Sequence, residues 1–248
     1  MKTAVFLTGF WRSGTNAAVR ALSKHNDIAI YNENNPTAFE NWKIKNLNII
    51  RNICLQEECR ISLFKPVCEP HRIAEFLNLG IDSKVIYLYR EPEKVVKSGL
   101  KNFSYWPQRH RKFIENFIDR KDFYSRYNLP VADEIRGHVK QLYNPDLNDD
   151  SVVAIRWLIS NEYYLGCNFR LDSNIFTISY EELTTIPVVH FSQICDFLGI
   201  DFNSAIADGI SPSKRHTFSI EIDEKVKVAI ESCYQQLKKS SGVNQNLT

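Results

Sequence analysis

The chain has 248 residues, of which 44% are hydrophobic and 24% are charged. This composition is typical of a globular protein and excludes a disordered or fibrous chain, and the length suits one α/β domain with a single core. The 31 Lys and Arg residues nearly balance the 29 Asp and Glu residues, which gives a net charge of +2. A charge this small gives no information about binding to nucleic acid or membranes, so any anion site must be local.

The apolar runs in the sequence are strand-sized, which is too short for a membrane span or for the core of a signal peptide. We therefore expect a cytoplasmic protein; the Golgi lumen would apply only if an N-terminal anchor had been removed. The six cysteines are scattered without paired spacing, which predicts free thiols. Cys59, Cys68 and His71 lack a second ligand pair at the usual spacing, so we expect no metal site.

Strand patterns alternate with helix patterns through most of the chain. Residues 3–8 predict a short buried strand ended by Gly9, and residues 15–25 predict a helix. The rhythm continues with strands predicted at 28–32, 60–65, 84–89 and 175–180, and with helices predicted at 70–79, 152–165 and 186–198. This alternation predicts an α/β fold in which a mostly parallel central sheet has helices on both faces.

Residues 101–150 break this rhythm and predict a largely helical insertion. Its first half, 101–126, contains seven Lys or Arg residues and many aromatic residues. An anionic saccharide stacked on the rings and a solvated amphipathic helix explain this composition equally well. We expect one domain over residues 1–240, followed by a polar, disordered tail at 241–248.

A glycine-bounded loop, GFWRSGTN (residues 9–16), joins the first predicted strand to the first predicted helix. Backbone N–H groups at such a loop point into one concavity, and the helix dipole adds partial positive charge, so this order predicts an anion site. The glycines have the spacing of a nucleoside-triphosphate P-loop, but Thr15 occupies the lysine position and the cation is Arg12. The loop therefore suits a phosphate flanked by a sulfuryl group better than it suits ATP. A plain glycine turn with a solvated Arg12 is the alternative.

A second motif, VIYLYREPEKVVKS, occupies residues 85–98. Its apolar strand ends at Arg90, and Pro92 suits the first turn of the helix that follows. Ser98 lies about two helical turns beyond Arg90, so a helix that folds back beside the strand end brings the hydroxyl near the guanidinium. We predict that the two side chains hold one phosphate, Arg90 by its fork and Ser98 as a neutral donor.

With both motifs in this order, the chain resembles the sulfotransferases that use 3′-phosphoadenosine-5′-phosphosulfate (PAPS), and it is closer to bacterial and carbohydrate-modifying members. Further similarities lie in residues 176–183, in Trp157 with Asn161, and in the basic segment 213–215. The resemblance implies a three-layer, P-loop-like fold. It also implies that PAPS is the donor, that 3′-phosphoadenosine-5′-phosphate (PAP) is the product, and that no metal is required.

The resemblance also implies roles for individual residues. The 5′-phosphate and the sulfuryl group would be cradled by Arg12, Ser13, Gly14, Thr15 and Asn16. The 3′-phosphate would be held by Arg90 and Ser98, and Lys214 or Arg215 would add charge over the nucleotide. Arg12 would also stabilise the charge that develops on the leaving oxygen during transfer.

An acceptor hydroxyl needs a general base. Glu33 is our candidate, because it follows the second predicted strand, which should neighbour the first and place Glu33 at the same sheet edge as the loop. His110 in the insertion is the alternative base, although the flanking Arg109 and Arg111 also fit a solvated basic face. Lys65 ends the third strand on the same side, where it could touch the acceptor or form a structural ion pair.

The sequence therefore predicts a sulfotransferase that moves a sulfuryl group from PAPS to a hydroxyl or amine of a small-molecule or saccharide acceptor. Two alternatives stay open: a P-loop small-molecule kinase, and a non-catalytic module that binds phosphorylated nucleotides. We expect neither a nucleic-acid partner nor stable membrane insertion.

Overall fold

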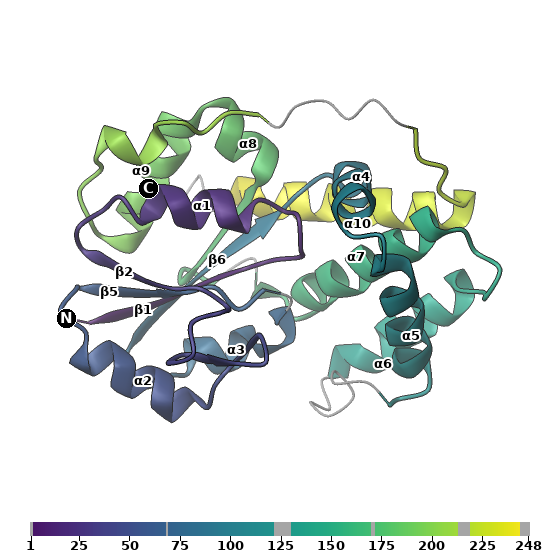
Figure 1. Cartoon of the computed structure of the whole chain (residues 1–248), viewed down its shortest axis with the longest axis horizontal. Helices are drawn as coiled ribbons and strands as arrows, with labels where there is room; N and C mark the ends of the chain where they lie inside the picture. The colour runs from purple at the N-terminus through teal and green to yellow at the C-terminus, as the bar shows by residue number, and fades with distance from the viewer. Residues whose placement is uncertain (1, 68, 122–129, 170–171, 213–218, 244–248) are drawn as a thin grey trace.

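The structure is a computed structural model that describes residues 2–67, 69–121, 130–169, 172–212 and 219–243. Figure 1 shows a twisted sheet with helices on both faces and a group of helices, including α5 and α6, beside it. The strands are β1 (Thr3–Thr8), β2 (Ile28–Tyr31), β3 (Phe39–Glu40), β4 (Lys43–Ile44), β5 (Ile61–Phe64), β6 (Asp82–Tyr89) and β7 (Ile175–Ser179).

The helices account for most of the remaining described residues. Those in the first half of the chain are α1 (Thr15–Leu22), α2 (Leu47–Gln56), the 3-10 turn η1 (Pro70–Arg72), α3 (Ile73–Leu77), α4 (Pro92–Asn102) and α5 (Trp106–Ile118). Those in the second half are α6 (Pro130–Leu142), α7 (Asp149–Gly166), α8 (Tyr180–Thr185), α9 (Pro187–Leu198), the 3-10 turn η4 (Ser204–Ala207) and α10 (Glu224–Val243). None of the described helices is both long enough and apolar enough to cross a membrane.

The main sheet has the strand order β2-β5-β1-β6-β7, and all its pairs are parallel. The predicted α/β fold with a parallel sheet is therefore confirmed. The prediction that the second strand neighbours the first is wrong, because β5 lies between β2 and β1. The carboxyl ends of all five strands still meet at one edge of the sheet, which is where ligands bind in open α/β folds.

The two faces of the sheet belong to separate hydrophobic clusters. Successive side chains of a strand point to opposite faces, so Ala4 and Phe6 join one cluster while Val5 and Leu7 join the other. On the first face Phe6 stacks on Phe76 of α3, with ring centroids 4.4 Å apart. The second face is covered by α1 and α9 (Figure 1). Because both faces of the sheet are packed against helices, the loops at its carboxyl edge are attached to a rigid sheet.

The prediction of a single helix over residues 70–79 is wrong, because this segment contains two short helical elements. The 3-10 turn η1 comes first and the short helix α3 follows. Arg72 separates them because its backbone leaves the helical region (φ −103°, ψ 4°), and its side chain pairs with Glu69 at 3.1 Å. Within 101–150, α5 and α6 pack on α7, which begins at the Asn148 cap, where the Asn148 side chain accepts a hydrogen bond from Ser151 N.

Candidate active site

The loop between β1 and α1 lies at the carboxyl edge of the sheet. Gly9 and Gly14 give it its shape, with φ of 152° and 94°. A Cβ atom at Gly9 would lie 2.0 Å from the Leu88 carbonyl oxygen, and one at Gly14 would lie 2.1 Å from the Tyr180 ring. Only glycine therefore lets the loop pass this close to β6 and α8.

The start of α1 offers an anion site. Gly14 is the N-cap residue and supplies no capping side chain, so the first N–H groups of the helix lack a side-chain acceptor. The Ser13 hydroxyl beside them is fully buried and has no hydrogen-bond partner among the described residues. Thr15, the first residue of the helix, is also buried. A buried polar atom normally has a partner, so this cradle fits a phosphate or a sulfuryl group.

Arg12 connects the two motifs. Its backbone has the left-handed φ of 66°, and its Nε donates a hydrogen bond of 2.9 Å to the Ser98 Oγ on α4. Its guanidinium lies over the Phe103 ring at 5.7 Å, and its carbonyl oxygen accepts a 2.9 Å hydrogen bond from Arg90 Nη1. Partial burial lowers the pKa of Arg12 from its ordinary value, yet arginine stays charged in proteins. Ser98 therefore contacts Arg12, where the sequence had paired it with Arg90.

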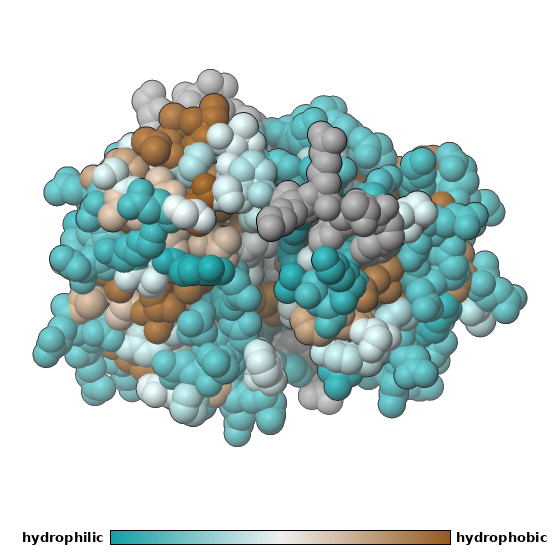
Figure 2. Space-filling view, turned by 45° about the horizontal axis from the view of Figure 1, so that its top comes forward, coloured by the Kyte–Doolittle hydropathy of each residue, from teal (hydrophilic) through white to brown (hydrophobic). Residues whose placement is uncertain are grey.

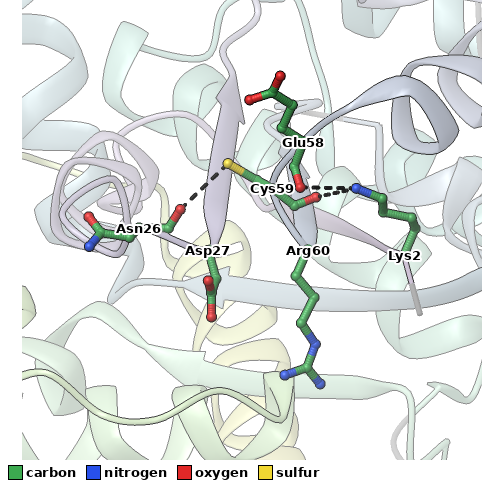
Figure 3. Close-up of a pocket in the computed structure, with 6 residues that line it drawn as sticks. All are labelled: Lys2, Asn26, Asp27, Glu58, Cys59 and Arg60. Atoms are coloured by element: carbon green, nitrogen blue, oxygen red, sulfur yellow. Dashed lines mark hydrogen bonds between the residues drawn. The ribbon is translucent and has the colours of Figure 1, made fainter.

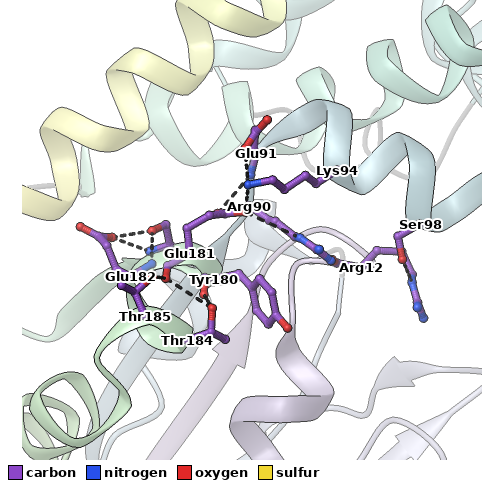
Figure 4. A network of polar contacts seen from close by, with 11 residues as sticks. Arg12, Arg90, Glu91, Lys94, Ser98, Tyr180, Glu181, Glu182, Thr184 and Thr185 are labelled. Atoms are coloured by element: carbon purple, nitrogen blue, oxygen red, sulfur yellow. Dashed lines mark hydrogen bonds and ion pairs between the residues drawn. The ribbon is translucent and has the colours of Figure 1, made fainter. Parts of the chain in front are cut away.

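Arg90 is buried at the end of β6, where Figure 4 shows it at the centre of a polar network. Its guanidinium lies over the Tyr180 ring at 4.4 Å, and its Nε is 3.8 Å from Glu181 Oε1. Lys94 contacts the same carboxylate oxygen at 3.6 Å. Burial lowers the pKa of Arg90, and the nearby Glu181 partly raises it again. Sequence reasoning missed Tyr180, although its place directly after a parallel strand could have marked it.

Glu33, Lys65 and Asn16 meet at the same edge. Glu33 follows β2, Lys65 follows β5 and Asn16 lies in the first turn of α1. The Lys65 ammonium forms an ion pair with Glu33 and donates a hydrogen bond to Asn16 Oδ1. The side chain of Lys65 is only 3% exposed, whereas that of Glu33 is 20% exposed. Lys65 follows β5, the strand that lies between β2 and β1, and its ammonium therefore connects Glu33 to Asn16 of the loop.

Two hollows flank α1. A cleft of about 630 Å³ has Glu33, Lys65 and Asn16 in its wall, and we call it the Glu33 cleft. A smaller groove of about 320 Å³ lies against α8 and is lined by Ala17, Arg20, Ala21, Lys24, Tyr180, Thr184 and residues 208–211. The Glu33 cleft includes Asn16, the last residue of the loop, and the groove includes Ala17, the residue that follows it. Lys214 and Arg215, expected over the nucleotide, lie outside the described residues.

His110 is buried, so the solvated basic face that its neighbours suggested is wrong for this side chain. It is 4% exposed and stacks on Trp11, with ring centroids 5.8 Å apart, while Trp106 packs edge-on at 5.1 Å. Its Nε2 has no hydrogen-bond partner in the part of the chain that the structure describes. Burial, and secondarily the charges of Arg156 and Arg109, lower the pKa of His110 to about 3. An imidazole of such low basicity is a poor proton acceptor.

A third hollow lies at the opposite end of the sheet (Figure 3). Here Lys2 Nζ donates to the carbonyl oxygens of Glu58 and Cys59, each at 3.1 Å, and the Cys59 thiol donates to the Asn26 carbonyl at 3.5 Å. It is separated from the loop by the length of β1, about 20 Å at the usual rise per strand residue. These contacts tie chain segments together and belong to the fold. A search of the described residues finds no group of three or more side chains placed to hold a metal ion.

The parallel sheet, the helix N-terminus with its buried hydroxyl, the buried Arg90 and the half-buried Arg12 form a site at the sheet edge that fits phosphate groups. The sulfotransferase domain family matches residues 2–248, and the chain belongs to this family.

Solved structures show the same fold. The sulfotransferase domain from the Synechococcus PCC 7002 olefin synthase aligns with a TM-score of 0.59 at 14% identity, over 93% of this chain and 94% of that one. The sulfotransferase domain from the curacin biosynthetic pathway aligns with a TM-score of 0.55 at 14% identity, over 98% of this chain and 97% of that one. No curated protein sequence matches the chain.

Proposed function

We propose that the protein transfers a sulfuryl group from PAPS to a hydroxyl or amine of a small-molecule or carbohydrate acceptor, with Glu33 as the general base. One observation carries this proposal: Lys65 contacts Asn16 of the loop and Glu33 of the neighbouring cleft at once. A donor site and a candidate base therefore share one buried side chain. Membership of the sulfotransferase family supports the choice of the sulfuryl group.

PAPS, as the donor substrate, supplies the sulfuryl group and a phosphate leaving group. Three groups fit the 5′ end of PAPS: the start of α1, the Ser13 hydroxyl and Arg12. They supply N–H and O–H hydrogen-bond donors and a positive charge at the place where the leaving oxygen becomes negative. Arg90 suits the 3′-phosphate, since its guanidinium is fixed by Tyr180 and by the carbonyl of Arg12. Fixed donors need little rearrangement during the reaction, which favours transfer.

Glu33 is proposed to take the proton of the acceptor hydroxyl. The acceptor oxygen bonds to sulfur as the bond between sulfur and the phosphate oxygen breaks, so the products are the sulfated acceptor, PAP and a proton on Glu33. Lys65 is proposed to orient the carboxylate. The choice of Glu33 rests on its place in the wall of the Glu33 cleft and on its contact with Lys65.

The kinase alternative loses support at one position. A P-loop kinase needs a lysine on the β- and γ-phosphates, and the chain has Thr15 there. The non-catalytic alternative differs from the proposal only in turnover, so binding alone does not separate the two.

Titration calorimetry with PAP in the presence of EDTA tests the donor site. We expect micromolar or tighter binding without Mg²⁺, and much weaker binding of AMP, which lacks the 3′-phosphate that Arg90 is proposed to hold. Absence of PAP binding, or binding that strictly requires Mg²⁺, would contradict the proposal. Binding of PAP without sulfuryl transfer to any member of an acceptor panel would favour the non-catalytic module.

A further inference from the structure

Trp42 is an unusual residue for its position. It lies at the tip of the β3–β4 hairpin, 68% exposed, with a left-handed φ of 65°. Asn41 before it has a φ of 50°. Hairpin turns with two positive φ values favour Asn and Gly, and a bulky side chain in this region is strained. Asn41 fits this preference and Trp42 does not, so the geometry of the turn does not account for the indole side chain.

The hairpin that carries Trp42 is held rigidly by a buried ion pair. Ile44 N donates to Glu69 Oε2 at 3.1 Å, and the Ile44 carbonyl oxygen accepts from Arg72 Nη1 at 3.2 Å. Glu69 and Arg72 are both buried and pair with each other. Lys45 N also donates to the Ala38 carbonyl oxygen at 2.9 Å across the base of the hairpin. Both backbone polar groups of Ile44, two residues after Trp42, are therefore held by hydrogen bonds to the ion pair.

Trp42 lines the Glu33 cleft, and among the described residues that do so it is the only aromatic one. Most of the other described residues in the wall have amide, hydroxyl or charged side chains, namely Asn16, Arg20, Ser23, Asn32, Glu33, Asn34 and Lys65, and two are aliphatic, Val19 and Ile30. The cleft thus combines one flat apolar surface with many hydrogen-bonding groups. Figure 2 shows one face of the molecule, which is mostly hydrophilic with hydrophobic patches between the hydrophilic residues.

We propose that Trp42 is an acceptor-binding residue and that the acceptor is a saccharide whose sugar ring lies against the indole. A pyranose ring has an apolar face and a rim of hydroxyl groups, which match the indole and the amide-rich walls respectively. A steroid or an alkyl phenol would need mostly apolar walls. The inference rests on the function proposed above, because a sugar bound against Trp42 would present one of its hydroxyl groups to Glu33, the proposed base.

Two glycine variants separate the ring from the turn. Trp42→Gly removes the indole and relieves the strained φ, while Asn41→Gly relieves the turn next to it and keeps the indole. Binding in the presence of PAP is measured by calorimetry with cellotetraose, N-acetylchitotetraose and unsulfated chondroitin tetrasaccharide, and with p-nitrophenol and a steroid alcohol as non-saccharide probes. We expect at least one saccharide to bind, with its Kd raised about tenfold in Trp42→Gly and unchanged in Asn41→Gly.

Thermal unfolding and PAP titration complete the test. Both glycine variants are expected to keep or raise Tm and to bind PAP as the parent protein does. A parent protein that binds PAP but no saccharide, or binds saccharides equally well without the indole, overturns the inference and leaves the proposed function standing. Trp42-dependent binding of only the phenol or the steroid overturns the saccharide class, and a clear fall of Tm in Trp42→Gly alone assigns the ring to the fold. Failure of PAP to bind the parent protein overturns the proposed function itself.

Discussion

Replacing Glu33 by Gln tests the proposed base, because it removes one charge and almost no volume. In the structure the carboxylate pairs with Lys65, whose side chain is 3% exposed, while 20% of the Glu33 side chain is exposed. The variant leaves the buried ammonium with Asn16 as its remaining partner in this cluster. Two losses are therefore expected together, one in turnover and one in the free energy of unfolding.

The two losses differ in size and origin. Loss of a general base lowers turnover by about 10²–10⁴-fold, which corresponds to about 2.7–5.5 kcal/mol of activation free energy. Loss of the carboxylate beside Lys65 should cost about 1–3 kcal/mol of stability. This is less than for a fully buried pair, because water still reaches part of Glu33. Adding Lys65→Met removes the unpaired charge, so the double variant should regain stability without regaining turnover.

The assay follows sulfuryl transfer from labelled PAPS at an acceptor-limited rate, with Tm measured on the same samples. Glu40→Gln is the matched control, since Glu40 is an exposed glutamate on the nearby hairpin, and it should keep the parental rate. Glu33→Gln with more than about a tenth of parental activity would remove Glu33 from the base role, because the lower end of the expected range would not be reached. Recovery of turnover together with stability in the double variant would show that the ion pair only supports the fold.

Three further predictions follow from the contacts of the site. Arg90→Ala should weaken the binding of PAP by about 10- to 150-fold, which is the cost of a charge-assisted hydrogen bond, and should hardly affect the binding of AMP. If calorimetry shows that PAP and AMP lose the same affinity, Arg90 only supports the fold. Gly14→Ala should cost about 1–2 kcal/mol of stability and weaken PAP, because its φ is 94° and the new methyl group meets an aromatic ring; Gly137→Ala, with open space around it, is the control in urea unfolding. Burial lowers the pKa of His110 and of His71 to about 3, against about 6.5 unfolded. The unfolded chain therefore binds more protons at these two positions below pH 6.5, so their contribution to stability is constant above that pH and falls toward pH 3 by up to about 1.4 kcal/mol per pH unit for each histidine. His110→Phe should halve this slope, and a stability independent of pH would contradict it.

The positions of the loop after β1 and of Arg90 at the sheet edge could be predicted from the sequence because their determinants are local. The backbone of the loop after β1 requires glycine at two positions, Gly9 and Gly14. Arg90 directly follows β6, a strand that the sequence marks by a run of apolar residues. The edge position of Glu33 was also predictable, since the carboxyl ends of parallel strands share an edge in any order. The insertion of β5 between β2 and β1 was not, because strand order depends on long-range pairing.

The surroundings of individual side chains were less predictable. The arginines beside His110 indicate a solvated face, but Trp11 from a distant loop covers the ring and buries it. Trp42 gave no signal at all, because its backbone conformation and its place in the Glu33 cleft exist only in the folded hairpin. Tyr180 likewise acquires its role only when Gly14 and Arg90 pack against it.

Transfer of the label from ³⁵S-PAPS to a panel of saccharide and small-molecule acceptors, measured in EDTA, tests the central claim most directly. The account predicts a labelled product and stoichiometric PAP, formed without metal and lost in Glu33→Gln. Absence of transfer to every acceptor despite tight PAP binding would contradict it, as would Mg²⁺-dependent transfer of phosphate from ATP by the same site.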